Sequence, residues 1–286
     1  MKRLPKPDLK PEVVYAACID GLSDATLSQR FKKIAATMSA QHVYYDTLAQ
    51  TERLHEFVAH DWGKREQIVI PDIRKGEFVD LYDKCMVEKN KPGRDYYDKI
   101  MMSAPRKICP YCCIGHVSTL DHFLSKSYYS SLSTLPANLI PACKDCNTGK
   151  GANKLSADNQ VPHPYFETDA IERDVWLQAR IVPQKMPIAD YSVAIPAHWP
   201  QPLGKRVENY FRDLDLGERF SVQAAGELER MARYLNQLTS QNDRIKHLRR
   251  QLVAEDERAR NSWATPLYRA AANDAWFYST GFKRLL

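Results

Sequence analysis

The sequence lacks the features of a membrane or secreted protein. No run of about 18 apolar residues, the length that a transmembrane helix needs, occurs in the 286-residue chain. The basic start MKRLPKPDLK has no apolar stretch behind it, so we expect neither a membrane span nor a secretory signal. We therefore expect a cytoplasmic protein without a membrane partner.

The sequence also has no internal repeat, no low-complexity tract and no strong excess of one charge. Its 41 Lys and Arg residues outnumber the 35 Asp and Glu residues slightly, for a net charge of +6. Such a balance permits a polyanionic partner such as nucleic acid but does not require one. A chain of this length can bury a sizeable core, in one large domain or two smaller ones.

Cysteine is scarce, and its arrangement argues against a disulfide framework. The chain has seven cysteines, an odd number, and four of them form two C-x-x-C pairs. This pattern is typical of a metal site in a reducing compartment. We expect Cys18 and Cys85, which lie outside the pairs, to be buried apolar thiols.

The two C-x-x-C pairs predict a structural zinc site. Cys109 and Cys112 form the pair CPYC, and Cys143 and Cys146 form the pair CKDC. Each turn can present two thiolates to one ion at about 2.3 Å, and two turns complete the tetrahedron that zinc prefers. A zinc site that uses Cys113 instead of Cys112 remains an alternative, because a C-x-x-x-C spacing can also bind zinc. A zinc enclosed by four thiolates has no free position for water, so any catalysis must use other residues.

Polar residues near the cysteines predict a second metal site with a base beside it. If one zinc knuckle leads into a β-hairpin and the other opens a helix, the zinc fixes Asp121 opposite Asn147. Two oxygen ligands of this kind suit magnesium or manganese completed by water and substrate phosphate. His122 follows Asp121 directly, and an ordinary pKa of about 6.5 suits it to take a proton from water.

The segments TLDHFLSKS and LPANLIPACKDCNTGKG, together with the two cysteine pairs, resemble the HNH endonuclease family in its zinc-containing ββα-metal form. The resemblance covers residues 108 to 153. It implies that Asp121 and Asn147 bind a catalytic magnesium or manganese, that His122 is the general base, and that Asn138 braces the loop orienting His122. Ser125 stands where the family often has proline, which affects loop rigidity but not the metal ligands.

The resemblance implies a metal-dependent endonuclease that hydrolyses phosphodiester bonds, with DNA as the expected substrate. RNA, including tRNA, remains an alternative, as does a zinc-containing adaptor that binds nucleic acid or protein without cutting it. Four lysines close to the motif are candidates for contacts with the phosphate backbone: Lys126, Lys144, Lys150 and Lys154. For Tyr128 and Tyr129 we expect loop packing rather than base stacking, and we expect His116 and His163 to be structural.

Segments outside the motif carry a second resemblance. The stretches KRLPKP, GRDYYDKI and HPYF and a helical tail are similar to longer HNH nuclease subunits of Septu-type and retron-associated anti-phage defence systems. In those systems the nuclease is encoded beside an ABC-type ATPase. The resemblance implies an ATPase partner that restrains or delivers the nuclease.

These patterns predict an α+β, mainly helical protein in which a four-cysteine zinc site holds together an HNH core flanked by helical regions. The expected regions are an N-terminal helical region (1–105), the nuclease core (106–160), a proline-rich connection with short strands (161–203) and a C-terminal helical region (204–286).

Hydrophobic spacing adds detail to these regions. It predicts one or two helices between Pro11 and Trp62, an extended piece at EQIVIPDI, and strands at VWLQARIV and DYSVAIP. A seven-residue pattern predicts one long helix through Leu228 and Leu252, and a closing helix ends at Gly281.

Overall fold

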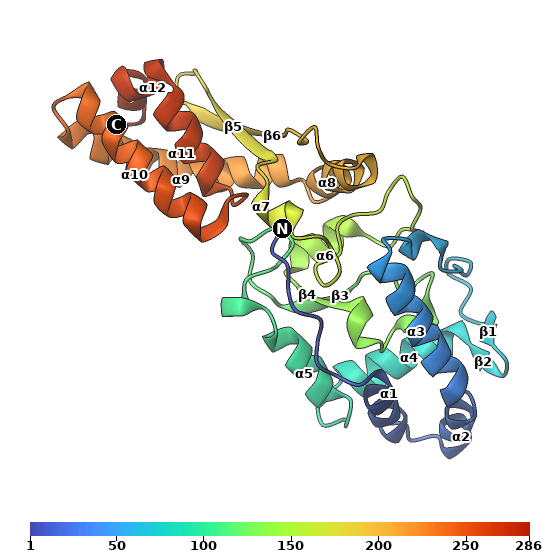
Figure 1. Cartoon of the computed structure of the whole chain (residues 1–286). Helices are drawn as coiled ribbons and strands as arrows, with labels where there is room; N and C mark the ends of the chain where they lie inside the picture. The colour runs from blue at the N-terminus through green and yellow to red at the C-terminus, as the bar shows by residue number, and fades with distance from the viewer. The chain divides into compact units, whose positions relative to one another are not determined.

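The computed structural model describes residues 1–286 and divides the chain into two compact units (Figure 1). Lys2–Glu167 forms one unit, and Thr168–Leu286 forms the body of the other. Both are mainly helical, and the chain contains three two-stranded antiparallel sheets. The mainly helical α+β class predicted from the sequence is confirmed. No helix combines the length and the apolar character that crossing a bilayer requires.

The N-terminal unit begins with three helices where the sequence predicts one or two. These are α1 (Pro11–Asp20), α2 (Ala25–Lys33) and α3 (Ala35–Gln50). The Asp24 carboxylate caps α2 by accepting the backbone N–H groups of Thr26 and Leu27, at 2.8 and 3.0 Å. The additional helix boundaries arise because this cap and a turn at Ile34 interrupt an otherwise continuous apolar pattern.

The remaining elements of this unit lead to a β-hairpin and a short helix. In chain order they are β1 (Ile68–Ile70), β2 (Ile73–Arg74), α4 (Lys75–Tyr82), a π-helical turn (Asp83–Val87), α5 (Arg94–Met102), β3 (Thr119–His122), β4 (Leu139–Ala142) and α6 (Lys144–Lys150). Short 3-10 turns occupy Leu54–Glu56, Pro105–Lys107, Ser130–Leu132 and Pro136–Asn138. The expected extended piece at EQIVIPDI is the β1–β2 hairpin. The β3–β4–α6 succession is the ββα arrangement of the predicted core.

One hydrophobic core joins the N-terminal helices to the ββα segment. It contains Phe31 from α2, Phe78 from α4 and Ile100 from α5, together with Leu120 of β3 and Leu139 of β4. These five side chains are at most 3% exposed. The helices before the cysteine motif therefore hold the hairpin in place.

Cys18 and Cys85 are buried in this core, as predicted. Burial, reinforced by the neighbouring Cys85 thiol, raises the pKa of Cys18 to about 12. A thiol with so high a pKa stays protonated and unreactive at neutral pH. The two residues contribute apolar packing and are separate from the four-cysteine motif.

Helices cover a hairpin in the C-terminal unit. Its elements are α7 (Ala170–Arg173), β5 (Leu177–Val182), β6 (Ile188–Val193), α8 (Gln201–Asp213), α9 (Leu216–Gln237), α10 (Gln241–Ala259), α11 (Ala264–Asn273) and α12 (Ala275–Ser279), followed by a 3-10 turn (Gly281–Leu285). The two predicted strands are β5 and β6, which pair along their whole length. Helix α9 packs on β6, and α11 packs on β5.

The prediction of one long helix through Leu228 and Leu252 is wrong, because the chain turns between α9 and α10. Leu238 is extended, and the Ser240 hydroxyl caps α10 by accepting the Asp243 N–H at 3.0 Å. Asn242, expected at an interrupting core position, is exposed. The apolar stripe is buried within this unit at Leu228, Met231, Leu235 and Leu248. The closing helix is likewise divided into α11 and α12, at Asp274.

Acidification below pH 6.5 is expected to destabilise the N-terminal unit, because it buries neutral histidines. Burial lowers the pKa of His42 on α3 to about 4 and that of His163 well below its ordinary value. The unfolded chain takes up these protons as the pH falls below about 6.5, whereas the folded chain does not. Stability that is present above pH 6.5 is therefore lost as the pH falls towards 4.

The contribution of His42 to this loss can be measured from the free energy of urea unfolding at pH 7 and at pH 5. Protonation of His42 should lower the free energy of unfolding by about 2 kcal/mol between these pH values. The His42→Met variant should not show this decrease. His116→Gln is the matched control, because His116 is exposed, and it should lose as much stability as the unmodified chain. An equal pH dependence in His42→Met and the unmodified chain would contradict the buried neutral state.

Candidate active site

The four predicted zinc ligands lie together. The Sγ atoms of Cys109, Cys112, Cys143 and Cys146 are all within 4.8 Å of one another, and all four residues are buried. Backbone N–H groups approach two of the sulfurs, from Gly115 to Cys112 at 3.3 Å and from Cys146 to Cys143 at 3.5 Å. Amides aimed at sulfur stabilise the thiolate form that binds metal. The cluster fits a structural zinc.

Cys113 lies outside this cluster. Its backbone has a left-handed φ of 58°, and its Sγ faces the Pro110 carbonyl at 3.8 Å. The turn brings Gly115 against the second knuckle, where a Cβ atom would lie 2.7 Å from both Cβ and Sγ of Cys143. The structure thus brings Cys112 rather than Cys113 to the other three cysteines, and only glycine fits at position 115.

Asp121 is a buried carboxylate at the end of β3, 3% exposed. Its Oδ2 atom accepts a hydrogen bond from the Tyr111 hydroxyl and another from the Lys150 ammonium, each at 2.8 Å. Burial raises the pKa of Tyr111 well above its ordinary range, and the Asp121 charge adds to this effect. Tyr111 therefore stays a hydrogen-bond donor, and Oδ1 is the Asp121 oxygen left for another ligand.

His122 is held in one tautomer. Its Nε2 lies 2.9 Å from the Ser133 carbonyl oxygen, which can only accept, so Nε2 carries the proton and Nδ1 is free to act as a base. The Tyr82 ring meets the imidazole edge to face, with centroids 4.5 Å apart. Burial, assisted by the charges of Lys126 and Lys150, lowers the pKa of His122 to about 3. The ordinary pKa of about 6.5 expected from the sequence is therefore wrong: the imidazole is neutral at physiological pH and is a weaker base than expected.

Asn138 braces the loop that joins β3 to β4. It is fully buried, and its Oδ1 accepts the Leu124 N–H at 2.7 Å. Its Nδ2 donates to the carbonyl oxygens of Leu124 and Leu132, at 3.1 and 3.2 Å. These bonds tie together the two ends of the loop that carries Ser133. Asn138 therefore supports His122 from behind and does not line the pocket.

Asn147 lies on α6 and contacts the first residue of β3. Its Nδ2 is 3.5 Å from the Thr119 hydroxyl, which leaves its Oδ1 as the free oxygen. Thr119 and Asp121 are two positions apart on β3, so their side chains point to the same face of the strand. An oxygen from Asn147 and one from Asp121 are donors that suit a hard divalent cation, so this pair fits the predicted catalytic metal.

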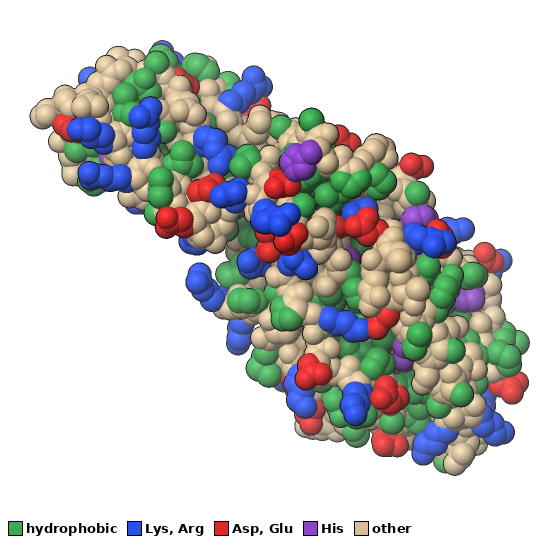
Figure 2. Space-filling view, in the orientation of Figure 1, with side chains coloured by type: hydrophobic (Ala, Val, Ile, Leu, Met, Phe, Trp, Pro, Cys, Tyr) green, Lys and Arg blue, Asp and Glu red, His purple; other side chains and the backbone are tan.

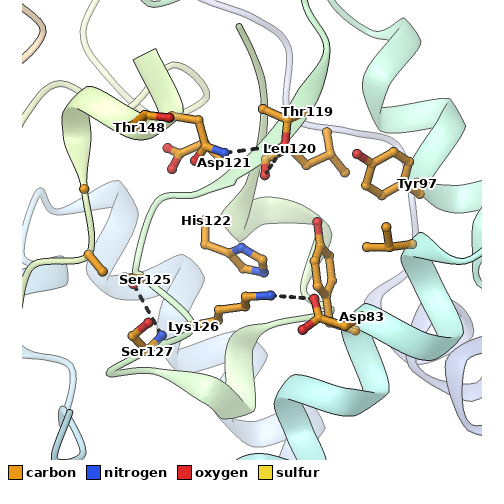
Figure 3. Close-up of a pocket in the computed structure, with 15 residues that line it drawn as sticks. Asp83, Tyr97, Thr119, Leu120, Asp121, His122, Ser125, Lys126, Ser127 and Thr148 are labelled. Carbon is orange, nitrogen blue, oxygen red and sulfur yellow. Dashed lines mark hydrogen bonds and ion pairs between the residues drawn. The ribbon is translucent and has the colours of Figure 1, made fainter. Parts of the chain in front are cut away.

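Asp121, His122 and Asn147 line a cleft of about 440 Å³. Figure 3 shows His122 and Lys126 projecting into it beneath Asp121, with Tyr97 and Asp83 on the opposite wall. Its lining includes Tyr82, Asp121, His122, Lys126, Asn147 and Thr148. The cleft therefore combines the neutral imidazole with both oxygen donors.

The four lysines predicted to contact phosphate lie in different surroundings. Lys126 lines the cleft and forms an ion pair with Asp83. Lys150 instead points inward to Asp121, with its side chain 12% exposed. Lys144 and Lys154 are exposed and lie outside the cleft lining. Lys and Arg side chains are intermixed with Asp and Glu over the visible face (Figure 2), which suits the small net charge.

Of the aromatic and histidine residues singled out near the motif, Tyr129 and His163 are packed inside the N-terminal unit, whereas His116 lies on its surface. Tyr129 is buried, and its hydroxyl accepts the Leu155 N–H at 3.1 Å. His163 is buried, with its Nε2 3.1 Å from the Tyr45 hydroxyl. His116 is exposed and forms an isolated bridge with Ile108.

Sequence reasoning missed three contributors to this site: Tyr82, Tyr111 and Ser133. Tyr111 lies within the CPYC pair, so its closeness to the cysteines was visible, but its contact with Asp121 was not. Tyr82 and Ser133 contact His122 from other parts of the fold. No spacing in the sequence marks either of them.

Comparison with known proteins agrees with this geometry. Residues 109–153 match the sequence model of the family described as HNH endonuclease. This stretch contains both cysteine pairs, β3, β4 and α6, so the chain carries an HNH domain.

The chain is also similar to a whole protein, protein ea31 of Escherichia phage lambda. It is 27% identical over 300 aligned positions, which cover 97% of this chain and 99% of ea31. The alignment extends far beyond the HNH match, so the sequence similarity includes the segments on either side of it. No solved structure matches the chain.

Proposed function

We propose that this protein is a metal-dependent endonuclease that hydrolyses phosphodiester bonds in nucleic acid, with DNA as its substrate. The observation that carries the proposal is the fixed tautomer of His122. Its Nε2–H is bound to Ser133, and its Nδ1 is left as a base in the cleft that Asp121 and Asn147 also line. The HNH match over residues 109–153 supports the same reaction class.

In the proposed mechanism His122 takes a proton from the attacking water at Nδ1. The Ser133 carbonyl accepts from Nε2 throughout, so it orients the ring and stabilises the imidazolium that forms. Asp121 and Asn147 would hold magnesium or manganese, which neutralises the charge that develops on the phosphate and the leaving oxygen. Asn138 keeps the loop closed behind His122 and takes no part in proton transfer.

The test is incubation of the purified chain with DNA and with total RNA, in magnesium, in manganese and in EDTA. We expect metal-dependent cutting of DNA that EDTA abolishes. Cutting of RNA but not of DNA would show that the protein is a ribonuclease, the alternative that uses the same active-site residues. Tight binding of either polymer without cutting in any metal would favour the adaptor alternative.

The prediction with the clearest metal dependence concerns Asn147. Asn147→Ala removes a neutral oxygen donor, so cleavage at low magnesium should fall by at least about 10-fold, the smallest loss typical when a contact behind a metal ligand is removed, and it should recover partly as magnesium or manganese is raised. Asp121→Ala removes the charged donor and should not recover. Cleavage rates over a metal titration check both outcomes. Thr148→Ala is the control, because Thr148 lines the same cleft on α6 and is not a proposed ligand.

We further propose that the nuclease acts in an anti-phage defence complex with an ABC-type ATPase. The support is the resemblance of the segments flanking the motif to nuclease subunits of Septu-type and retron-associated systems. A nuclease can cut the nucleic acid of the cell that makes it, so its activity needs to be restrained. Exposed apolar side chains on helices are suitable contacts for a restraining partner. Val222 on α9 and Val253 on α10 are 62% and 57% exposed.

Co-purification of the full chain with an ATPase encoded beside it tests this proposal. We expect a complex that survives gel filtration at micromolar concentration and that Val222→Asp and Val253→Asp weaken. Met102→Asp is the matched control, because Met102 is 63% exposed on α5 in the N-terminal unit. Separate elution of the two proteins, with and without ATP, would refute the complex.

A further inference from the structure

The Asp121 carboxylate receives one hydrogen bond from each half of the cysteine cluster. Tyr111 lies between Cys109 and Cys112, and its hydroxyl donates to Oδ2 at 2.8 Å. Lys150 lies four residues beyond Cys146, at the end of the helix that the second cysteine pair opens, and its Nζ donates to the same Oδ2 at 2.8 Å. Tyr111 is fully buried, so this contact is shielded from water.

Lys150 uses all of its hydrogen-bonding capacity at this place. Its ammonium group has three N–H donors, and its three acceptors are Asp121 Oδ2, the His122 carbonyl at 2.7 Å and the Phe123 carbonyl at 3.0 Å. It also stands over the Phe123 ring, 5.3 Å from the centroid. With every proton engaged, Lys150 ties the end of α6 to the end of β3 and has none left for a phosphate oxygen.

We infer that Tyr111 and Lys150 are positioning residues that fix Oδ2 of Asp121, so that Oδ1 is presented beside Asn147 as a metal ligand. The inference rests on the proposed function in taking Asp121 as that ligand. It gives the four-cysteine cluster a second role, because the same two turns that gather the thiolates also orient the carboxylate. Partners behind a metal ligand typically change metal affinity or activity by about 10- to 100-fold when they are removed.

Five variants of the full chain, with Lys150→Arg as the fifth, test the inference. Tyr111→Phe removes one hydroxyl, and its control is Tyr165→Phe, which removes a buried hydroxyl bound to the Leu139 carbonyl at 2.7 Å. Lys150→Met removes the ammonium, and its control is Lys144→Met, on the exposed start of the same helix. Each protein is assayed for zinc content, for thermal unfolding, for Mn²⁺ binding by the electron paramagnetic resonance of free Mn²⁺, and for single-turnover cleavage.

We expect Tyr111→Phe and Lys150→Met to keep the zinc content of the parent chain and to bind Mn²⁺ about 10- to 100-fold more weakly. Their cleavage rate should recover at high metal concentration, a split that a general loss of structure would not give. Both controls should bind Mn²⁺ as the parent does. Lys150→Arg, which keeps the charge and several donors, should recover part of the affinity.

Unchanged Mn²⁺ affinity in folded Tyr111→Phe would overturn the inference. Tighter binding in Lys150→Met would also overturn it, because the ammonium would then compete with the metal rather than orient its ligand. If Lys150→Met does not fold, Tyr111→Phe and Lys150→Arg decide. A parent chain that binds no Mn²⁺ refutes both proposals, whereas one that binds Mn²⁺ but cuts no nucleic acid refutes only the nuclease.

Discussion

Replacing His122 by Gln is expected to lower the cleavage rate by about 10²- to 10⁴-fold, the usual contribution of a general base. The Gln amide can still donate to the Ser133 carbonyl that His122 Nε2 contacts at 2.9 Å, but it cannot accept a proton at neutral pH. The loss should appear in the single-turnover rate at saturating metal. Affinity for metal should change little, because Asp121 and Asn147 remain.

His122→Gln is a better test than His122→Ala because the side chain is buried. Only 8% of His122 is exposed, and its ring packs against Tyr82. Alanine would leave the Ser133 carbonyl without its donor, at a cost of about 1–3 kcal/mol, so a loss of activity would be mixed with a loss of stability. Burial of His122 therefore makes alanine an ambiguous substitution for testing the general base.

His116→Gln serves as the matched control for this experiment, since His116 is exposed and belongs to the same segment. Zinc content and thermal unfolding should be equal in the two variants. Full activity of His122→Gln on a substrate that the parent chain cuts would rule out His122 as the base.

Replacing Cys146 by Ser is expected to unfold the ββα segment as well as to abolish cleavage. Structural zinc in small domains has an apparent binding free energy of about 10–16 kcal/mol at neutral pH, comparable to the whole stability of a typical domain, about 5–15 kcal/mol. Cys146 is fully buried with its sulfur in the cluster. The N-terminal helices share a core with β3 and β4, so unfolding should spread to them.

Elemental analysis and circular dichroism check this result. The parent chain should carry one zinc and lose its cooperative melting transition in a strong chelator. Cys113→Ser is the matched control: its sulfur lies outside the cluster, so it should retain the zinc and change stability by no more than about 0.5 kcal/mol. A parent protein purified without zinc, yet folded, would refute the structural role.

The sequence predicted those parts of the site that are encoded locally. The cysteine spacing and the adjacent Asp121 and His122 are set by neighbours along the chain, and these residues carry the family resemblance that implied the ββα arrangement. The break between α9 and α10 was missed because the apolar stripe continues in register through it. The break is marked in the sequence by Ser240 with Asp243 three residues later, a helix-start signal that the seven-residue pattern does not take into account.

The supporting contacts of the site were beyond reach because their partners are distant in sequence. The Tyr45 hydroxyl lies 3.2 Å from Asn138 Oδ1 although the residues are 93 positions apart. Tyr82 reaches His122 from the end of α4. Which aromatic residue meets which loop depends on how the helices pack, and periodicity in the sequence determines only which face of a helix is buried.

The hydrogen bond between Tyr45 and Asn138 limits how the HNH segment can spread by recombination. A gene exchange that copied only residues 109–153 would leave Tyr45 and Tyr82 behind, and with them the support behind the loop and the wall against His122. The recipient protein would inherit the cysteines and a loosely held imidazole. Selection should therefore favour recombination events that exchange the whole N-terminal unit. Hybrid genes joined near residue 167 should yield active proteins more often than hybrid genes joined at the edges of the motif.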